Sequence, residues 1–585
     1  MKYCLICKLA SGKSTCRGFH LFSHPVRILS SNFFALLFAG VFTVPALSLF
    51  LMALDAETEI WAHLSSTVFP VYLRNSLLLL VGVGAGTLML GVVSGFLTAL
   101  FEFPGRRWLE WMLMLPMAMP AYILAMVYLE LLEYSGTLQS ALRDFFSWKT
   151  PADYWFPEIA SIGGAVLMLS LVLYPYVYLL SRNAFQQQSP VFTEAGRLLG
   201  DRTRYGLWKI ALPMARPAVA VGVSLALMEA LADFGTVQLF SVPTFTTGIY
   251  HIWFGTANAP AAAQLSLSLL GFVGLLIALE RFSRRQQRFH GKASSLRRSE
   301  RRPLPNRYVP LAQFFCLLPV FLGFFLPGWM LLHWSWQSFS SWNAGRFISD
   351  ASNSLLLAGI TSLLALAVAM LLNFGIRLPN RKMLKGASRL ASLGYAFPGP
   401  VIALGVLMPL SWFDQHFNQW LNAEGQTGTY WLSGTIFVLI YAYLIRFLAL
   451  AQGSVESGMA SITPQIEDSG RMLGSPQGKV LRDLYLPMLR GSLWTGGLLV
   501  FVDVMKELPA TLMLQPFNTS TLATRAFAYA SEEMLKEAAP WCLAIVMTGL
   551  LPVIMLNRKL RSSAIPIDTS HRLMPVPPES QLQPT

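Results

Sequence analysis

Charged residues are scarce in this chain. Asp, Glu, Lys and Arg make up 13% of its 585 residues, whereas 54% are apolar and the mean hydropathy is +0.50. Since a soluble domain carries about a quarter charged residues, this composition excludes an ordinary soluble protein and predicts a polytopic membrane protein. The net charge of +14 could suggest nucleic-acid binding, but the basic residues gather in short loops between apolar spans, which indicates topology, and no nucleic-acid partner is expected.

Cysteine is also rare, and this excludes a disulfide framework. The five cysteines lie at positions 4, 7, 16, 316 and 542, and the last two fall in apolar spans. The first three, with His20 and His24, could be zinc ligands, but a single CxxC without a second spaced pair is weak support. We therefore expect no metal site and interpret residues 1–30 as a cytoplasmic extension.

Two kinds of enzymatic signature are missing. Residues 12–15 (GKST) imitate the end of a phosphate loop, but Cys7 stands where its first glycine is required. No Walker A motif occurs elsewhere, so ATP would be hydrolysed on another subunit and this chain would bind no cofactor. His251, His333 and His416 are isolated, and no Ser/His/Asp grouping is evident. The sequence predicts no catalytic residues and no enzyme activity.

Long apolar runs dominate the rest of the chain. They lie at about 31–54, 75–101, 109–132, 159–181, 214–240 and 264–280, and again at 309–333, 353–376, 388–411, 430–452, 489–514 and 537–556. Each is near the roughly 20 residues that cross a bilayer. The sequence predicts twelve crossings in two units, 31–280 and 309–556. A basic cytoplasmic linker at 281–308 joins them, and a proline-rich, disordered tail follows at 557–585.

One polar stretch occurs twice. Residues 189–213 (SPVFTEAGRLLGDRTRYGLWKIALP) return without a gap, 274 positions later, as residues 463–487 (TPQIEDSGRMLGSPQGKVLRDLYLP). Each copy begins with a helix-capping residue and a proline and reaches a glycine ten residues after that proline. These residues are Ser189, Pro190 and Gly200, and Thr463, Pro464 and Gly474. Each copy therefore predicts a short amphipathic helix that needs a partner groove.

Basic residues set the orientation of the chain. With the amino terminus inside, the inner loops contain clusters at 106–107, 182–209, 377–385 and 471–490, whereas the outer loops 241–263 and 412–429 contain no Lys or Arg. Both copies of the repeated stretch, and both termini, then lie in the cytoplasm.

The repeated stretch resembles the Glu-Ala-Ala motif of the membrane subunits of binding-protein-dependent ABC importers. The first copy fits through Glu194, Ala195, Gly196, Gly200, Leu212 and Pro213, and the second, less closely, through Asp468, Ser469, Gly470, Gly474, Leu486 and Pro487. The resemblance implies cytoplasmic coupling helices that dock on an ABC ATPase dimer, and a periplasmic solute-binding protein on the other side of a bacterial inner membrane. The alternative is a plain amphipathic connector.

A second match supports a duplicated unit. The sequence NSLLL occurs at 75–79 and at 353–357, at the head of the second span of each half. An even number of crossings gives both halves one orientation. The predicted fold is therefore all-α, with twelve transmembrane helices in two parallel six-helix repeats, as implied by the resemblance to type I, MetI-like ABC permeases.

Ionisable residues at the end of the fifth span of each half indicate a pathway, because charges in a membrane are costly and usually functional. They are Glu229 and Asp233 in the first half, and Asp503, Lys506 and Glu507 in the second. Asp233 and Glu507 are related by the 274-residue offset, and we expect them to face each other in an acidic ring that admits a cation. The alternative is structural: Lys506 neutralises a neighbouring carboxylate, and Gly235 and Pro509 break the helix.

Residues 231–254 and 506–531 resemble fused permeases of ferric-iron importers, which implies Fe(III) as the solute. Related fused permeases carry thiamine or phosphonates, and these stay open as alternatives. An ion-coupled secondary transporter would explain the buried carboxylates but not the two copied helices. A membrane receptor or scaffold would use those helices for docking alone.

Overall fold

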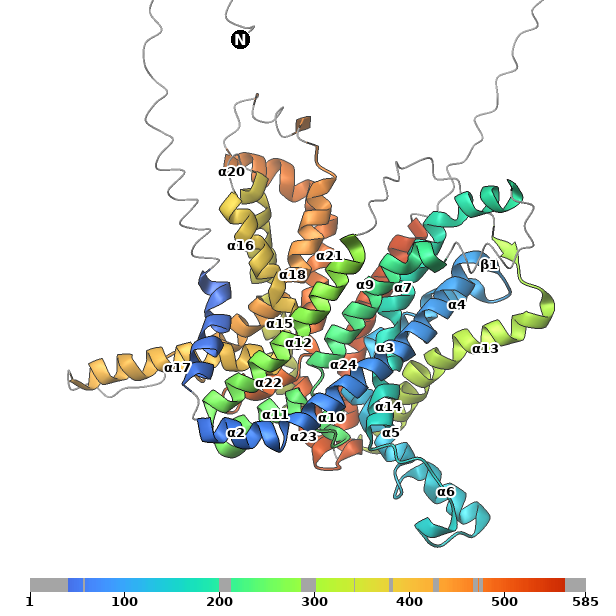
Figure 1. The fold of residues 1–585 in the computed structure, drawn as a ribbon, viewed down its shortest axis with the longest axis horizontal. Helices are drawn as coiled ribbons and strands as arrows, with labels where there is room; N and C mark the ends of the chain where they lie inside the picture. The colour runs from blue at the N-terminus through green and yellow to red at the C-terminus, as the bar shows by residue number, and fades with distance from the viewer. Residues whose placement is uncertain are drawn as a thin grey trace, which may run out of the picture.

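The structure is a computed structural model, and within the part that it describes the chain is almost entirely helical (Figure 1). The described residues are 40–55, 58–198, 212–285, 301–340, 342–377, 382–423, 431–463, 465–466, 472 and 477–562. Multiple long apolar helices confirm the prediction of an all-α, multi-pass membrane protein.

The elements of the first half follow a helix at Gly40–Leu54. They are α2 (Thr58–Ser66), α3 (Phe69–Leu100), β1 (Phe101–Glu102), α4 (Arg106–Met112), η1 (Leu115–Ala118), α5 (Ala121–Leu132), α6 (Thr137–Phe146), η2 (Pro151–Asp153), α7 (Ile162–Leu198), α9 (Leu212–Ala232), α10 (Gly235–Leu239), α11 (Phe245–His251), η4 (Ile252–Thr256) and α12 (Ala259–Arg285).

The second half begins with a short strand that pairs with β1. Its elements are β2 (Arg302–Pro303), η5 (Asn306–Tyr308), α13 (Val309–Val320), η6 (Phe321–Phe325), α14 (Leu326–Gln337), α15 (Ala344–Arg377), α16 (Lys382–Ser392), η7 (Leu393–Ala396), α17 (Gly399–Ala423), α18 (Ile436–Ala460), α20 (Gln477–Val480), η8 (Leu481–Tyr485), α21 (Leu486–Met505), α22 (Pro509–Leu514), α23 (Leu522–Ser531) and α24 (Leu535–Ser562).

Among the described residues, nine helices are long and apolar enough to cross a membrane, or up to ten if one bent pair counts as a span. The sequence predicted twelve crossings. Of the first expected span, the structure describes only the shorter apolar helix Gly40–Leu54. The expected span at 388–411 is divided among α16, η7 and α17. The number twelve therefore stays a prediction.

The third expected crossing of the first half, at about 109–132, is bent in the structure and stays a prediction as a single span. Arg106–Ala118 and Ala121–Phe146 meet at 89°. Pro116 lies at the start of η1 and Pro120 caps α5, and neither residue has an N–H to continue a helix through the bend. Pro398 stands at the matching break before α17, where its carbonyl accepts bonds from two following N–H groups at 3.1 Å.

Corresponding elements recur at nearly constant spacing. α7 and α18 begin 274 residues apart, as do α9 and α21, and α10 and α22. The two matched asparagines make the same bond: Asn75 Nδ2 donates to the carbonyl of Pro243 at 2.9 Å, and Asn353 Nδ2 donates to that of Ser520 at 3.1 Å. Each bond ties a long helix to the residue just before a threonine cap, that of α11 or α23.

Small residues let the helices of each half pack closely. A Cβ on Gly222 of α9 would lie 2.8 Å from the backbone of Val177 on α7, and one on Gly496 of α21 would lie 2.9 Å from Ser454 on α18. These two glycines are also 274 residues apart. Close backbone approach at small residues is the usual way in which membrane helices associate.

The first helix of each half packs against the other half. Ser48, in the helix Gly40–Leu54, donates to the carbonyl of Gly405 on α17 at 2.7 Å. Reciprocally, the hydroxyl of Tyr128 on α5 donates to the carbonyl of Leu322 in η6 at 2.8 Å. The first helix of each half is therefore joined to the opposite half.

Candidate translocation site

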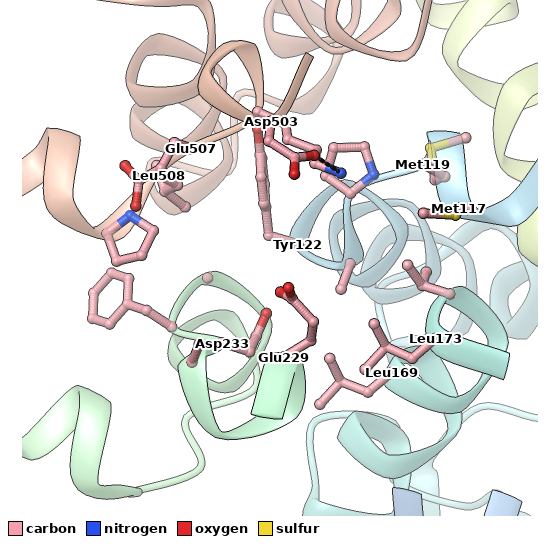
Figure 2. A pocket seen from close by; sticks show the side chains of 18 of the residues that line it. Met117, Met119, Tyr122, Leu169, Leu173, Glu229, Asp233, Asp503, Glu507 and Leu508 are labelled. Atoms are coloured by element: carbon pink, nitrogen blue, oxygen red, sulfur yellow. Dashed lines mark ion pairs between the residues drawn. The ribbon is translucent and has the colours of Figure 1, made fainter. Parts of the chain in front are cut away.

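A cavity of about 140 Å³ lies between the two halves, where α9 and α21 end. Its first-half wall comes from η1, α5, α7, α9 and α10, and its second-half wall from η7, α18, α21 and the start of α22. Figure 2 shows carboxylates from both walls around one space. Its charged lining residues are Glu229, Asp233, Arg446, Asp503, Lys506 and Glu507. The remaining lining is mostly apolar and aromatic.

Asp233 caps a short helix. The fifth span was expected to continue to residue 240, but α9 ends at Ala232 and α10 begins at Gly235. The Asp233 carboxylate accepts bonds from the N–H groups of Thr236 and Val237 at 3.1 and 3.2 Å, and from the Thr236 hydroxyl at 3.0 Å. These bonds satisfy N–H groups that the start of a helix leaves unpaired.

Glu507 does the same for α22. Its carboxylate accepts bonds from the N–H groups of Ala510 and Thr511 at 3.2 and 3.1 Å, and from the Thr511 hydroxyl at 2.7 Å. Arg446 on α18 pairs with the same carboxylate at 3.0 Å, and the Glu507 side chain is only 2% exposed. The carboxylate is therefore fully engaged by its own half.

The expected acidic ring of Asp233 and Glu507 takes a different form in the structure. Both residues line the cavity, but their carboxylates bond to the helices that follow them. The structural alternative accounts for part of the pattern, because Gly235 and Pro509 lie at helix starts and Lys506 pairs with a carboxylate. Within the described ranges, no group of three or more His, Cys, Asp and Glu is arranged to hold a metal ion.

Glu229 and Asp503 are the other pair at the 274-residue spacing, and neither of them caps a helix. Glu229 Oε1 accepts a bond of 2.6 Å from the hydroxyl of Tyr395, which lies in η7 of the opposite half. Asp503 forms an ion pair with Lys506 at 2.8 Å. These two carboxylates are held by side chains alone, so a small rotation would free them.

The basic residues of the cavity all come from the second half. Arg446 and Lys506 have Val172 and Ala232 at the corresponding first-half positions. The described lining therefore carries four carboxylates against two bases, and both bases are already paired. The charged residues of the first-half wall are all acidic, whereas those of the second-half wall include both signs. The sequence repeat alone does not reveal this difference in charge between the two walls.

Sequence reasoning missed Arg446 and the tyrosines Tyr122, Tyr176 and Tyr395. Arg446 was detectable, because it is the single charged residue in the apolar run 430–452, and such residues usually mark a site. The tyrosines carried no signal, since nothing in the sequence distinguishes a phenol that faces a cavity from one packed in the core.

Most of the predicted coupling residues lie outside the described residues or in a part whose side chains are not described. Leu212 begins α9 and Leu486 begins α21, with Pro213 and Pro487 next, as predicted. The first copy differs from its expected start: α7 runs to Leu198, so no new helix opens at Ser189. In the second copy α18 ends at Ala460 and helical residues resume at Gln465, after Thr463.

Residues 88–287 match the family described as binding-protein-dependent transport system inner membrane component. The chain is an inner-membrane ABC permease. The permease is 26% identical, over 83% of its own length and 89% of the relative's, to an Fe(3+)-transport system permease protein, FbpB 2, of Haemophilus influenzae. It is 21% identical to the ferric transport system permease protein FbpB of Actinobacillus pleuropneumoniae, over 76% of this chain and 63% of that one.

Shorter relatives also match the permease. A putative 2-aminoethylphosphonate transport system permease protein, PhnV, of Salmonella typhimurium is 25% identical over 40% of this chain and 88% of its own. Among solved structures, a bacterial alginate ABC transporter in complex with an alginate-bound periplasmic protein aligns with a TM-score of 0.35. Its identity is 15%, over 44% of this chain and 95% of that one.

Proposed function

We propose that the permease is the whole membrane-spanning body of an ATP-driven importer of ferric iron. Two parallel six-helix halves would form twelve crossings with both termini in the cytoplasm. A periplasmic binding protein would deliver the ion to the face that carries α10, α11, α22 and α23. An ABC ATPase dimer would act from the opposite face, where α20 lies (Figure 1).

The observation that carries this proposal is the cavity between the halves. Both halves contribute to its lining, and its four carboxylates outnumber its two bases. Carboxylate and phenol oxygens are the hard ligands that suit Fe(III). The similarity to two ferric permeases over three quarters or more of the chain supports the same cargo.

A phosphonate cargo is the second candidate, and it is favoured by the PhnV similarity. An anionic solute would need a free base, yet Arg446 and Lys506 are both paired with carboxylates at 3.0 and 2.8 Å. The acidic first-half wall would also repel the phosphonate group. The charge of the cavity therefore favours a cation.

The test is iron uptake by cells that lack their own ferric importers. These cells express the permease together with the ATPase and the binding protein that are encoded beside its gene. We expect uptake of radiolabelled Fe(III) that depends on the permease. Uptake of 2-aminoethylphosphonate or thiamine without iron uptake would refute ferric iron as the cargo. Uptake that is driven by an ion gradient in the absence of the ATPase would refute an ATP-driven importer.

Coupling to the ATPase gives a separate prediction. Gly200 and Gly474 are expected to be left-handed residues that end the coupling helices, where a β-carbon costs about 1 kcal/mol or more. Replacing either with Val should leave ATP hydrolysis in the assembled complex while uptake falls. The control is Gly453→Val, because a β-carbon on Gly453 meets nothing within 4 Å. Normal uptake in both coupling variants would show that these helices do not transmit the motion.

A further inference from the structure

We propose that Arg377 is a positioning residue that clamps both ends of the second copy of the repeated stretch, residues 463–487, to α15. Through this clamp, motion of the stretch passes directly into a long helix of the second half. The inference rests on the proposed function, because it names the side chain that connects a coupling stretch with the membrane-spanning body.

The clamp holds the start of the stretch through backbone carbonyls. α18 ends at Ala460, and the last carbonyls of a helix have no partner within it. Arg377 Nη1 donates to the carbonyl of Ile462 at 2.9 Å, and Nη2 donates to the carbonyl of Met459. An arginine at this end of a helix satisfies such carbonyls and is attracted to the negative end of the helix dipole. Because Ile462 directly precedes Thr463, the entry into the stretch is fixed to α15.

The same side chain reaches the end of the stretch. Arg377 Nη1 also donates to the hydroxyl of Tyr485 at 3.4 Å, and the guanidinium carbon lies 5.8 Å from the centre of the Tyr485 ring. Tyr485 is fully buried and directly precedes Leu486, where α21 begins. Phe374, about one turn before Arg377 on α15, packs edge-on against the same ring with 5.4 Å between the ring centres. One helix therefore holds the residues at which the stretch begins and ends.

The two clamp positions hold alanine in the first half. Counting from the matched NSLLL segments, Ala99 stands at the position of Arg377, and Ala211 stands at that of Tyr485 at the 274-residue spacing. Neither side chain can donate a hydrogen bond or offer a ring. The helices before the two copies differ as well, because α7 continues into the first copy, to Leu198, whereas α18 ends before the second copy begins. A continuous helix joins the first copy to its half, and a side chain joins the second.

α15 extends from the clamp to the opposite face. It is a single helix of 34 residues without a proline, about 50 Å long. At its far end Asp350 accepts bonds of 3.1 Å from Arg525 on α23 and from Trp541 on α24. One continuous element therefore connects the clamp with the face on which we propose that the binding protein docks.

The geometry of the clamp requires arginine. A planar guanidinium presents several N–H donors in a fixed fork, so one group can bond to two carbonyls and lie over a ring at the same time. Lysine keeps the charge but places it at a single point. Arg377→Lys therefore separates two roles: the charge that stabilises a helix end, which lysine supplies, and the clamp, which it does not supply.

The first test is amide hydrogen exchange of the full-length purified permease in detergent, measured by mass spectrometry. Arg377→Met should speed exchange in residues 463–487 about tenfold or more, because the hydrogen bonds to a charged group are lost. Residues 189–213 should exchange as in the unchanged permease, since the first copy has no such clamp. Arg377→Lys should give an intermediate rate. Arg346→Met, at the exposed other end of α15, is the matched control and should change neither copy.

The second test measures transmission in liposomes that contain the permease with its ATPase and binding protein. The readout is the ratio of ATP hydrolysis with the binding protein to hydrolysis without it. Arg377→Met should lower this ratio about fivefold or more, and Arg377→Lys should recover part of it. A purely structural role would reduce the amount of folded permease and leave the ratio unchanged.

Several results would overturn the clamp. They are unchanged exchange in residues 463–487, equally faster exchange in both copies, full retention of the native exchange by Arg377→Lys, and an unchanged hydrolysis ratio in Arg377→Met. Arg377→Gln replaces Arg377→Met if that variant does not fold.

Exchange of the purified permease depends on neither the cargo nor the ATPase, so the two proposals fail separately. Iron uptake by the unchanged permease with the wrong exchange pattern would refute the clamp and leave the proposed function standing. The expected exchange pattern in a permease that takes up no iron and shows no hydrolysis dependent on the binding protein would refute the proposed function and leave the clamp.

Discussion

Removal of Arg446 should destabilise the permease by leaving Glu507 buried without a counter-charge. Breaking a buried ion pair by deleting one partner costs about 3–5 kcal/mol. Glu507 keeps its three bonds to the start of α22, so Arg446→Met should fall at the lower end, about 3 kcal/mol. In a chain of this size, that corresponds to a fall in apparent melting temperature of about 2–3 °C.

The assay is thermal unfolding of the full-length permease in detergent, monitored by the loss of its size-exclusion peak. All variants are heated at the same rate, because large membrane proteins unfold irreversibly and their apparent melting temperature depends on that rate. The double variant Arg446→Met, Glu507→Gln should recover more than half of the loss, since no buried charge is left unpaired. The first half shows that a capping carboxylate can do without an arginine when it is less buried. Val172 stands at the position that corresponds to Arg446, and the capping carboxylate of that half, on Asp233, is only half-buried.

Two results would refute this reasoning. If Arg446→Met melted at the same temperature as the unchanged permease, Glu507 would not depend on its partner. If the double variant were as unstable as Arg446→Met, the cost would come from lost packing of the arginine stem and not from the unpaired charge.

Two further changes test packing, one beside the cavity and one where α15 meets α23 and α24. Gly235→Ala places a β-carbon 2.6 Å from Cβ of Tyr122 and 2.9 Å from Cδ2 of Leu508, so it should cost about 1–3 kcal/mol and lower the melting temperature. Gly271→Ala, where a β-carbon meets nothing within 4 Å, is its control. Asp350→Asn removes the charge of a carboxylate that accepts bonds of 3.1 Å from Arg525 and Trp541, and it should lower the free energy of unfolding by about 3 kcal/mol. The control is Asp55→Asn, at an exposed carboxylate, which should have no effect. Equal stability of the two variants would contradict a role for Asp350 in joining α15 to α23 and α24.

Hydropathy predicted the long apolar helices that the structure describes, because the bilayer imposes length and composition on every helix that crosses it. It also placed the Leu-Pro starts of α9 and α21 correctly. It could not predict the 89° bend after Ala118, because Pro116 and Pro120 are compatible with either a kinked helix or a break. Nor did it predict that α7 continues past Pro190, although the three glutamines at 186–188 are good helix formers.

The candidate site was predictable in its residues but not in their roles. Charge in an apolar run identified Glu229, Asp233, Asp503 and Glu507, and all four line the cavity. Which carboxylates cap a helix and which stay available depends on where the helix ends and on partners from other segments. Tyr395 lies 166 residues from Glu229, and a separation of that size is invisible to a local pattern.

The exchange of first helices between the halves has a consequence for biogenesis. When the ribosome has completed the first half, the surfaces of α3, α4, α5 and α7 that α13, η6 and α14 later contact are still uncovered, and the helix at Gly40–Leu54 has no α17 to lie against. A translation intermediate at that stage therefore exposes both surfaces that later pack against the second half. The nascent chain depends on the insertion machinery, or on lipid, to cover these surfaces until the second half has been synthesised.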